Sequence, residues 1–389
     1  MMEFVKKEET LIIKLGGRVD SSNAAEVEKE LIDICTENEH GKVVVDIEKL
    51  EYISSAGLRV ILKIKKSQND MEIINASNEV YEIFSMTGFS DIISIKKALR
   101  TISTDGCELI GKGGHGTVYR LDTDTIIKVY DKTEPLDEIE REIEYARNAF
   151  VSGIPTAIAY DVVKCGESYG TVFELINSNT LSHVLNTQPE KYNEYSKKYI
   201  ELVHTLHTTE TDTNRLSNIK DLYNKWADDM LEYFSGDEVD LLHEVINSVE
   251  DRKTFVHGDI HPKNIMVQNG ELLFIDMADL TYGHPVFDYG GTGVTHMLSS
   301  EENVKNLIGV EKKIAVQLWN DLLKAEFGGR SEEEFQKINE MLLNFAWLKF
   351  SLAPAANKTM EPKFKQMLAN TARGKFLPQA QSLVGAVCF

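Results

Sequence analysis

Cysteine is scarce in this chain, and its placement excludes two kinds of architecture. Only four cysteines occur among 389 residues, and no two of them form a CxxC pair. A disulfide framework or a zinc site would need closely and regularly spaced cysteines. Scattered thiols are instead typical of a protein from a reducing compartment. The four positions are Cys35, Cys107, Cys165 and Cys388.

The sequence also lacks the apolar segments that direct a chain to a membrane. Residues 1–10 carry too many charges to form a signal peptide. No apolar run approaches the roughly 20 residues that a transmembrane helix needs. We therefore expect a cytoplasmic protein that has no membrane partner.

The chain has fewer basic than acidic residues. Lys and Arg number 42 against 62 Asp and Glu, which gives a formal net charge of −20. An acidic surface repels nucleic acid and anionic lipid, so neither is an expected partner. The hydrophobic content of 42% and the charged content of 27% are those of a globular protein. The length is sufficient for two or three domains.

The first hundred residues alternate between strand and helix patterns, which predicts a layered α/β domain. Apolar runs at residues 11–15, 43–47 and 71–74 are the expected strands. Amphipathic patterns follow them, with apolar residues at helical spacing. Ser21 and Ser22 are expected to cap the first helix, Ser54 and Ser55 to open the second, and residues 80–86 to form the third.

Residues 2–100 resemble the STAS domain of anti-sigma factor antagonists. The most specific part is Val-Val-Val-Asp-Ile at 43–47, leading to Tyr-Ile-Ser-Ser-Ala-Gly-Leu-Arg at 52–59. In that family a serine at the start of the helix accepts phosphate, and this position is Ser55 here. A helix N-terminus stabilises an added dianion. Ser54 and Ala56 depart from the family pattern, and the alternative is that Ser55 only caps the helix.

A polar turn at residues 103–106 predicts the boundary of a second module. We expect a first domain over 1–100, followed by an N-terminal lobe over 101–178 and a C-terminal lobe over 179–389. The final stretches with clear helical patterns are 316–327 and 335–352, and patterns at 192–208 and 222–249 precede them.

The chemistry is expected in the string His-Gly-Asp-Ile-His-Pro-Lys-Asn at 257–264, followed by Phe-Ile-Asp at 274–276. Phosphoryl transfer needs a carboxylate that orients the attacking hydroxyl and oxygen ligands that hold Mg²⁺. Asp259, Asn264 and Asp276 supply that set, and apolar runs on both sides predict two strands that hold the loop. The pattern therefore predicts an ATP-dependent phosphotransferase, whereas the alternative is a tight turn with polar caps.

A second string, Gly-Lys-Gly-Gly-His-Gly-Thr-Val at 111–118, carries Gly111, Gly113, Gly114 and Gly116. Glycines allow the backbone to approach phosphates closely. A strand pattern rather than a helix follows, so the string favours a kinase loop over a dinucleotide-binding fingerprint. The next apolar run, 125–130, contains Lys128, which is expected to bind the α- and β-phosphates. The alternative is an edge lysine that reaches water.

Residues 105–370 resemble the aminoglycoside phosphotransferase and choline kinase group of the kinase-like fold. The resemblance rests on His-Gly-Asp-Ile-His-Pro-Lys-Asn, on Ile-Asp, on the glycine string and on the lysine strand. It implies a bilobal α+β domain with a β-rich N-lobe and a mostly helical C-lobe, and ATP and Mg²⁺ as cofactors. Asp259 would accept the proton of the acceptor hydroxyl, and Asn264 and Asp276 would hold Mg²⁺.

The resemblance also implies further positions. Lys128 would need an acidic partner on the helix at 135–150, and Arg141-Glu142 matches the register of the family, so Glu142 is favoured over Glu138, Glu140 and Glu144. Backbone groups from Glu174 to Ile176 would hold the adenine edge. Asp288 would brace the catalytic loop, and His284 stands where the family has an aspartate.

Three functions are consistent with this sequence. The first is a phosphotransferase that acts on a hydroxyl of a small molecule, with the STAS domain as its regulator. The second is a signalling kinase that phosphorylates Ser55 of its own or a homologous STAS domain, where fusion would raise the effective concentration, and that acts on an anti-sigma-factor-like partner. The third is an ATP-binding switch without catalysis.

Overall fold

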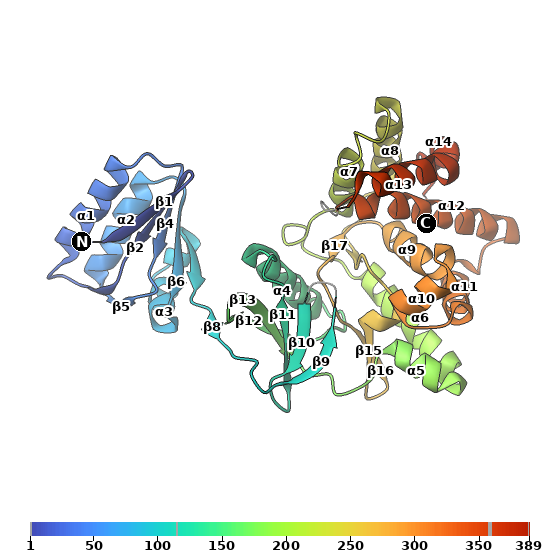
Figure 1. Ribbon diagram of the computed structural model, residues 1–389, viewed down its shortest axis with the longest axis horizontal. Coiled ribbons are helices and arrows are strands. Elements are labelled where there is room, and N and C mark those ends of the chain that lie inside the picture. The colour runs from blue at the N-terminus through green and yellow to red at the C-terminus, as the bar shows by residue number, and fades with distance from the viewer. Residues whose placement is uncertain (1, 114–115, 357–359, 388) are drawn as a thin grey trace. The chain divides into compact units, whose positions relative to one another are not determined.

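The structure is a computed structural model that describes residues 2–113, 116–356, 360–387 and 389 (Figure 1). The chain divides into two compact units, Met1–Ile102 and Ser103–Phe389. One residue expected at the nucleotide site, Gly114, lies outside the described residues. Within the part of the chain that the structure describes, no helix is both long and apolar enough to cross a bilayer.

The first unit is a layered α/β domain, as the alternating pattern predicted. Its main sheet has the order β1-β2-β4-β6-β7; β1 and β2 are antiparallel, and the other neighbours are parallel. The strands are β1 (Glu3–Lys7), β2 (Thr10–Lys14), β4 (Lys42–Asp46), β6 (Met71–Ala76) and β7 (Ser94–Lys97). A separate parallel pair is formed by β3 (Gly17–Val19) and β5 (Leu50–Ile53), and β8 (Arg100–Thr101) ends the unit.

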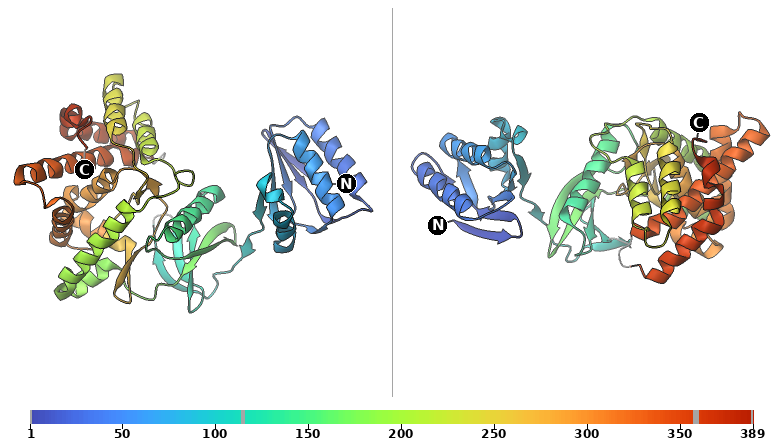
Figure 2. Two further views of the ribbon diagram at one scale, coloured as in Figure 1. Left: turned by 180° about the vertical axis from the view of Figure 1, so that it is seen from behind. Right: turned by 90° about the horizontal axis from the view of Figure 1, so that it is seen from above.

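Three α-helices cover this sheet, and α1 and α2 lie side by side (Figure 2). They are α1 (Ala24–Glu37), α2 (Ser55–Ser67) and α3 (Asn78–Met86), with a 3₁₀ turn at Phe89–Asp91. Fully buried aliphatic residues from the strands, such as Leu11, Ile13, Val43 and Val45, form the core beneath them. The expected helices are therefore present, but their first residues need two corrections.

The expected cap of α1 at Ser21 and Ser22 is wrong. The backbone N–H and the hydroxyl of Ser22 both donate to Asp20 Oδ1, at 2.9 and 2.6 Å, so this segment closes a turn on the preceding aspartate. The helix begins later, and its N-cap is Asn23. Side-chain oxygens of this kind compete locally for backbone donors, which shifts a helix start by a few residues.

At α2 the two adjacent serines have different places. Ser54 is the N-cap, and its Oγ accepts from the backbone N–H groups of Ala56 and Gly57 at 3.2 and 3.5 Å. Ser55 is the first helical residue, and it is exposed. The alternative that Ser55 merely caps the helix is therefore wrong, since its neighbour does so.

The second unit begins with an antiparallel sheet in which β11 lies between β13 and β10. Its strands are β9 (Glu108–Lys112), β10 (Gly116–Arg120), β11 (Thr125–Tyr130), β12 (Ala159–Cys165) and β13 (Ser168–Glu174), and α4 (Leu136–Val151) packs on β12 and β13. A Cβ atom at Gly116 would lie 2.3 Å from the carbonyl oxygen of Val129, so only glycine permits this approach of β10 to β11.

Helices make up most of the rest of this unit (Figure 1). They are α5 (Leu181–Thr187), α6 (Tyr192–Thr208), α7 (Ile219–Asp228), α8 (Gly236–Ser248), α9 (Val286–Gly293), α10 (Glu301–Ile308), α11 (Lys312–Phe327), α12 (Glu332–Leu352), α13 (Pro362–Lys375) and α14 (Leu377–Leu383). The pattern expected to be helical over 222–249 is interrupted after α7. Ser235 and Glu238 form a capping box there, which starts a new helix.

Two helices of this unit, α9 and α12, approach each other closely through glycines. A Cβ atom at Gly290 would lie 3.0 Å from the carbonyl oxygen of Phe345, and one at Gly293 would lie 2.8 Å from the Cβ atom of Ala346. The close approach brings the C-terminal half of α12 near the segment that precedes α9. That segment contains the string at 257–264 in which the chemistry is expected, here called the catalytic string.

Candidate active site

The catalytic string forms a loop between two short strand pairs. It follows β14 (Phe255–Val256), which pairs with β17 (Thr281–Tyr282), and leads through a 3₁₀ turn at Pro262–Asn264 into β15 (Ile265–Gln268). β15 pairs with β16 (Glu271–Phe274), which supports the expectation of two strands that hold the loop. The backbone N–H of Ile275 donates to the carbonyl oxygen of Asn264 at 2.9 Å. The turn that carries Asp276 is therefore tied to the end of the loop.

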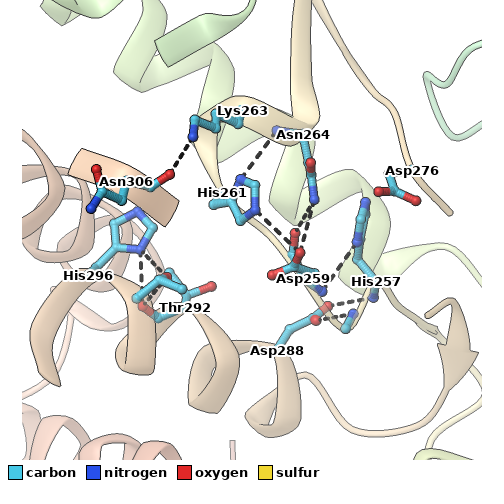
Figure 3. A network of polar contacts seen from close by, with 12 residues as sticks. His257, Asp259, His261, Lys263, Asn264, Asp276, Asp288, Thr292, His296 and Asn306 are labelled. Carbon is cyan, nitrogen blue, oxygen red and sulfur yellow. Dashed lines mark hydrogen bonds and ion pairs between the residues drawn. The ribbon is translucent and has the colours of Figure 1, made fainter. Parts of the chain in front are cut away.

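Asp259, His261 and Asn264 form one polar cluster (Figure 3). Asn264 Nδ2 donates to Asp259 Oδ2 at 3.1 Å and to the Asp259 carbonyl oxygen at 3.2 Å. His261 Nδ1 accepts from the backbone N–H of Asn264 at 3.3 Å, so the proton of a neutral ring is on Nε2, which lies 3.3 Å from Asp259 Oδ2. The motif is thus an interlocked loop rather than only a turn with polar caps.

The Asp259 carboxyl is ionised near neutral pH. Burial acts to raise its pKa, but the hydrogen bond from His261, together with the charges of His261, Lys349 and His257, lowers the pKa to about 2. About half of the side chain, 48%, is exposed, so a ligand can reach the carboxylate. It can orient a hydroxyl group as a hydrogen-bond acceptor.

Asp288, at the first turn of α9, braces the loop from below. Its carboxylate accepts from the backbone N–H groups of His257 at 2.8 Å and Gly258 at 2.7 Å. A third bond comes from His207 Nε2 on α6 at 3.0 Å. Burial would raise the pKa of Asp288, but the bond and charge of His207 outweigh it and lower the pKa. A buried carboxylate with three donors is a structural anchor.

His284 occupies the position where the family pattern has aspartate. It is buried, and its Nδ1 accepts from the backbone N–H of Val286 at 3.1 Å, as a capping carboxylate would. Burial lowers the pKa of His284 to about 4, so the ring is neutral and can accept at physiological pH.

One contact to the loop comes from a residue that the sequence did not suggest. Lys349, on α12, donates from Nζ to the carbonyl oxygen of Gly258. The other residue missed was His207. Both stand on helices far away in sequence and have no local motif, so the sequence pattern gave no signal for either residue.

Lys128 lies on β11 and has two carboxylate partners. Its Nζ lies 2.7 Å from Glu142 Oε1 on α4 and 3.4 Å from Asp276 Oδ1. The alternative of an edge lysine is wrong, because β11 is flanked on both sides and only 19% of the side chain is exposed. Burial acts to lower the pKa of Lys128, but the charges of Asp276 and Glu142 raise it, so the group stays cationic.

Of the four glutamates considered on α4, Glu142 is the one that meets Lys128. It is 7% exposed, whereas Glu138 and Glu144 are exposed to solvent. The sheet-facing stripe of α4 includes Ile139, Glu142, Ile143 and Ala146, which follow helical spacing. Glu142 is therefore placed toward the sheet by the register of its apolar neighbours.

Of the glycine string, Gly111 lies on β9 and Gly116 begins β10, and the Gly113 N–H donates to the Gly116 carbonyl oxygen at 2.9 Å. A Cβ atom at Gly111 would meet nothing within 4 Å, and one at Gly113 would meet only that carbonyl oxygen, at 3.8 Å. Packing within the chain therefore requires glycine at Gly116 but not at Gly111 or Gly113. At those two positions the backbone is left uncovered.

The segment expected to hold adenine joins the sheet to the helical half. Glu174 is turned inward, because its Oε1 accepts from the backbone N–H of Ile158 at 2.9 Å. Ile176 belongs to a small buried apolar cluster with Ala157 and Leu273. Met266 on β15 and Ile275, directly after β16, pack against that cluster. The segment therefore has an apolar lining next to the catalytic loop.

The oxygen donors fit Mg²⁺ better than a metal that needs a full protein cage. Among the residues that the structure describes, no group of three or more His, Cys, Asp or Glu is arranged to hold a metal ion. Mg²⁺ is commonly held by one or two side chains together with substrate phosphates and water. Asp276 has a positive φ of 63° and a half-exposed carboxylate, which is available to such an ion.

Comparison with known proteins identifies both units. Residues 1–102 match the model of the STAS domain, and residues 106–305 match that of the phosphotransferase enzyme family. Over 89 residues the chain is 38% identical to BtrV of Bordetella bronchiseptica, which is named as an anti-sigma factor antagonist; the match covers 22% of this chain and 76% of BtrV.

Two solved structures are similar at low identity. The ADP-bound aminoglycoside phosphotransferase APH(2'')-Ib is 14% identical, with 71% of this chain and 94% of that chain covered and a TM-score of 0.46. A choline/ethanolamine kinase family protein from Mesorhizobium loti is 17% identical, with 71% and 87% covered and a TM-score of 0.45. On the two family matches, the expected STAS and kinase-like domains are confirmed. The chain therefore belongs to the phosphotransferase enzyme family and carries a STAS domain ahead of its phosphotransferase domain.

Proposed function

We propose that this protein transfers the γ-phosphoryl group of Mg-ATP to a hydroxyl group of a small molecule, with the STAS domain as a regulatory module. The observation that carries the proposal is the ion pair between Lys128 and Asp276, 148 residues apart in sequence. It joins the sheet that bears the glycine turn to the turn that is tied to Asn264. The residues to which this proposal assigns phosphate binding and metal binding are therefore joined by a direct contact.

Each of the grouped residues has a role in this proposal. Asp259 accepts a hydrogen bond from the acceptor hydroxyl, orients it and takes its proton as transfer proceeds. Lys128, held by Glu142, binds the α- and β-phosphates, and Asn264 and Asp276 hold Mg²⁺. Bound Mg²⁺ would supply charge neutralisation at the phosphates. Because a carboxylate of such low pKa is a weak base, Asp259 contributes mainly through orientation.

The nucleotide would lie along the glycine turn and the connecting segment. Gly111 and Gly113 leave their backbone open for the phosphates, which accounts for two glycines that packing does not require. Gly114 and Gly116 complete the string. The backbone from Glu174 to Ile176 would bind the adenine edge, and the apolar cluster around Ile176 would line the ring.

A second function is favoured by the place of Ser55. Because Ser54 caps α2, the exposed Ser55 hydroxyl is available at the helix N-terminus, where a phosphate would be stabilised. In this version the protein is a signalling kinase that modifies Ser55 of its own or a homologous STAS domain and acts on an anti-sigma-factor-like partner. The free Cys35, Cys107 and Cys165 are in keeping with a cytoplasmic setting for either function.

The test is incubation of the full chain with Mg-ATP, comparing wild type with Asp259→Asn. Intact mass reports phosphate on the protein, and ADP release with and without a panel of hydroxyl compounds reports transfer to a small molecule. Asp240→Asn, an exposed change on α8, is the matched control. The proposal expects acceptor-dependent ADP release that Asp259→Asn abolishes and Asp240→Asn retains.

The other outcomes separate the alternatives. One added phosphate that maps to Ser55, and that is absent in Asp259→Asn, would replace the first function with the second. ATP binding without ADP release or mass gain under all conditions would contradict both and leave a non-catalytic switch.

A further inference from the structure

We propose that Lys349 is a positioning residue for phosphoryl transfer, which holds the Gly258 peptide from α12 and places a fixed positive charge beside Asp259. The inference rests on the proposed function of this site. Its first support is that the backbone directly before Asp259 is held from two directions. Asp288 accepts from the Gly258 N–H at 2.7 Å, and Lys349 Nζ donates to the Gly258 carbonyl oxygen.

The Gly258 peptide has little other freedom. Its φ is +86°, a left-handed value that favours glycine. A Cβ atom there would lie 2.8 Å from the Cβ atom of Asp279 and 2.9 Å from the Asp279 carbonyl oxygen. The N–H and the carbonyl oxygen of Gly258 are both hydrogen-bonded, and Asp279 fills the space where a side chain would lie. These contacts therefore set the direction of the next residue, Asp259.

Gly291 on α9 leaves the space through which the Lys349 side chain reaches the loop. A Cβ atom at Gly291 would lie 2.8 Å from Lys349 Nζ and 3.4 Å from the Gly258 carbonyl oxygen. A larger residue at this position would therefore push the flexible end of Lys349 away from its present place. Together with the close packing of α9 on α12 at Gly290 and Gly293, this brings a lysine from near the end of α12 to the catalytic loop.

The charge of Lys349 also acts where negative charge accumulates. Burial is the largest influence on the pKa of both Asp259 and Asp279 and acts to raise it, while the positive charge of Lys349 acts to lower both. Asp276 is a third carboxylate in this group, since it raises the pKa of Asp279. A transferred phosphoryl group would add more negative charge, and the fixed positive charge of Lys349 would compensate for it.

The competing interpretation is that Lys349 only fastens α12 to the loop and contributes stability alone. The chain contains a matched lysine for this comparison. Lys312 Nζ on α11 donates to the carbonyl oxygens of Met297 and Ser299 at 2.9 and 2.8 Å, away from the proposed site residues. Lys312→Met removes the same kind of contact without touching the loop.

The experiment measures Mg-ATP hydrolysis, with water as acceptor, by the full chain in five forms: wild type, Lys349→Met, Lys349→Arg, Lys312→Met and Gly291→Ala. Thermal denaturation gives the folded fraction of each. We expect Lys349→Met to lower kcat between about 10- and 100-fold, the size typical of a misplaced reacting group, with KM for ATP within about threefold of wild type. Lys349→Arg should recover part of kcat. Gly291→Ala should lower kcat although the charge remains, because the added methyl displaces the ammonium group.

Two results would overturn the inference while leaving the proposed function intact. One is a kcat for folded Lys349→Met within threefold of wild type. The other is an equal loss of kcat in Lys312→Met, which would mean that any lost anchor has this effect. Failure of the wild type to release ADP faster than Asp259→Asn, both with water and with the panel of hydroxyl compounds as acceptors, would instead overturn the proposed function, and the role of Lys349 would fall with it.

Discussion

The catalytic loop and the glycine turn lie on the two sides of one proposed nucleotide site, and they are held very differently. The loop is bonded to α9 through Asp288, to α12 through Lys349 and to the turn after β16 through the backbone of Asn264. The glycine turn is held by its own strand pair, and Leu109 and Ile110 before it are 60% and 46% exposed. The contacts that hold the loop therefore come from three other elements, whereas the described residues beside the glycine turn are held mainly by their own strand pair.

The same contrast separates two aspartates that lie twelve residues apart. Asp288 is 1% exposed and accepts three hydrogen bonds, while half of the Asp276 side chain is exposed and its partner Lys128 is 3.4 Å away. An exposed carboxylate with one weak partner adds little stability. Substitution of Asp276 should therefore lower turnover without lowering stability, whereas substitution of Asp288 should lower stability.

The largest effect on turnover is expected from Asp276→Asn. Asparagine tolerates the left-handed backbone at this position, where φ is 63°, so the fold should be retained. Loss of one charged ligand of Mg²⁺ should lower ADP release by a factor of about 10² to 10³, the size seen when a transition-state charge contact is removed. Thermal denaturation should be unchanged. Wild-type turnover in this variant would remove Asp276 from the metal site.

Asp288→Asn should lower stability strongly, in contrast to Asp276→Asn. An amide in this pocket cannot accept from three donors with the same strength, so breaking the buried charge cluster should cost about 3 kcal/mol of stability. The midpoint of thermal denaturation should then fall by roughly 6–12 °C, and turnover should fall with the loosened loop. Asp321→Asn, which removes a carboxylate bonded to Tyr192 at 2.7 Å outside the loop, is the control. A midpoint no lower than that of this control would contradict the anchoring role.

This contrast also explains what could be predicted from the sequence. Local patterns indicated the alternating strands and helices of the first domain, the two strands around the loop and the central lysine strand. Apolar periodicity depends only on the residues of each segment, so it can be recognised without knowledge of the fold. Glu142 was favoured among four glutamates because the resemblance placed Arg141-Glu142 in the register of the family's helix, and Glu142 is the residue that pairs with Lys128. The motif around Asp259 depends on residues within twenty positions, so spacing alone was informative.

What the sequence could not show are contacts between distant elements. His207 and Lys349 lie on α6 and α12, where a histidine or a lysine is ordinarily part of a solvated face. Their roles depend on how α9 packs against its neighbours. The glycines at 290, 291 and 293 permit this packing, but their presence in the sequence does not predict it. The start of the first helix was misplaced for a different reason: the N–H and the hydroxyl of Ser22 both donate to Asp20, and the helix starts only after this turn, with Asn23 as its N-cap.

A smaller effect, confined to nucleotide use, is expected from Glu142→Gln on the loosely held side. Lys128 would lose the charge of its nearer partner and keep its longer ion pair with Asp276, so its position at the phosphates would be less defined. A lost hydrogen bond between charged groups is worth about 1.5–3 kcal/mol, so KM for ATP should rise roughly tenfold or more while kcat changes less. The exposed Glu144→Gln is the matched control. A fall in kcat with no change in KM would place Glu142 elsewhere in the cycle.

The smallest effects extend the contrast to the two serines of the STAS domain. Ser54→Ala removes the side chain that accepts from Ala56 and Gly57, and loss of an N-cap costs about 1 kcal/mol. Ser55→Ala removes an exposed hydroxyl at the next position, and surface changes of this kind stay within about 0.5 kcal/mol. Thermal denaturation should therefore rank Ser54→Ala below Ser55→Ala, with the latter equal to wild type. If Ser55→Ala were the less stable variant, its hydroxyl would be part of the fold and not free to accept phosphate, and the signalling alternative would lose the observation that favours it.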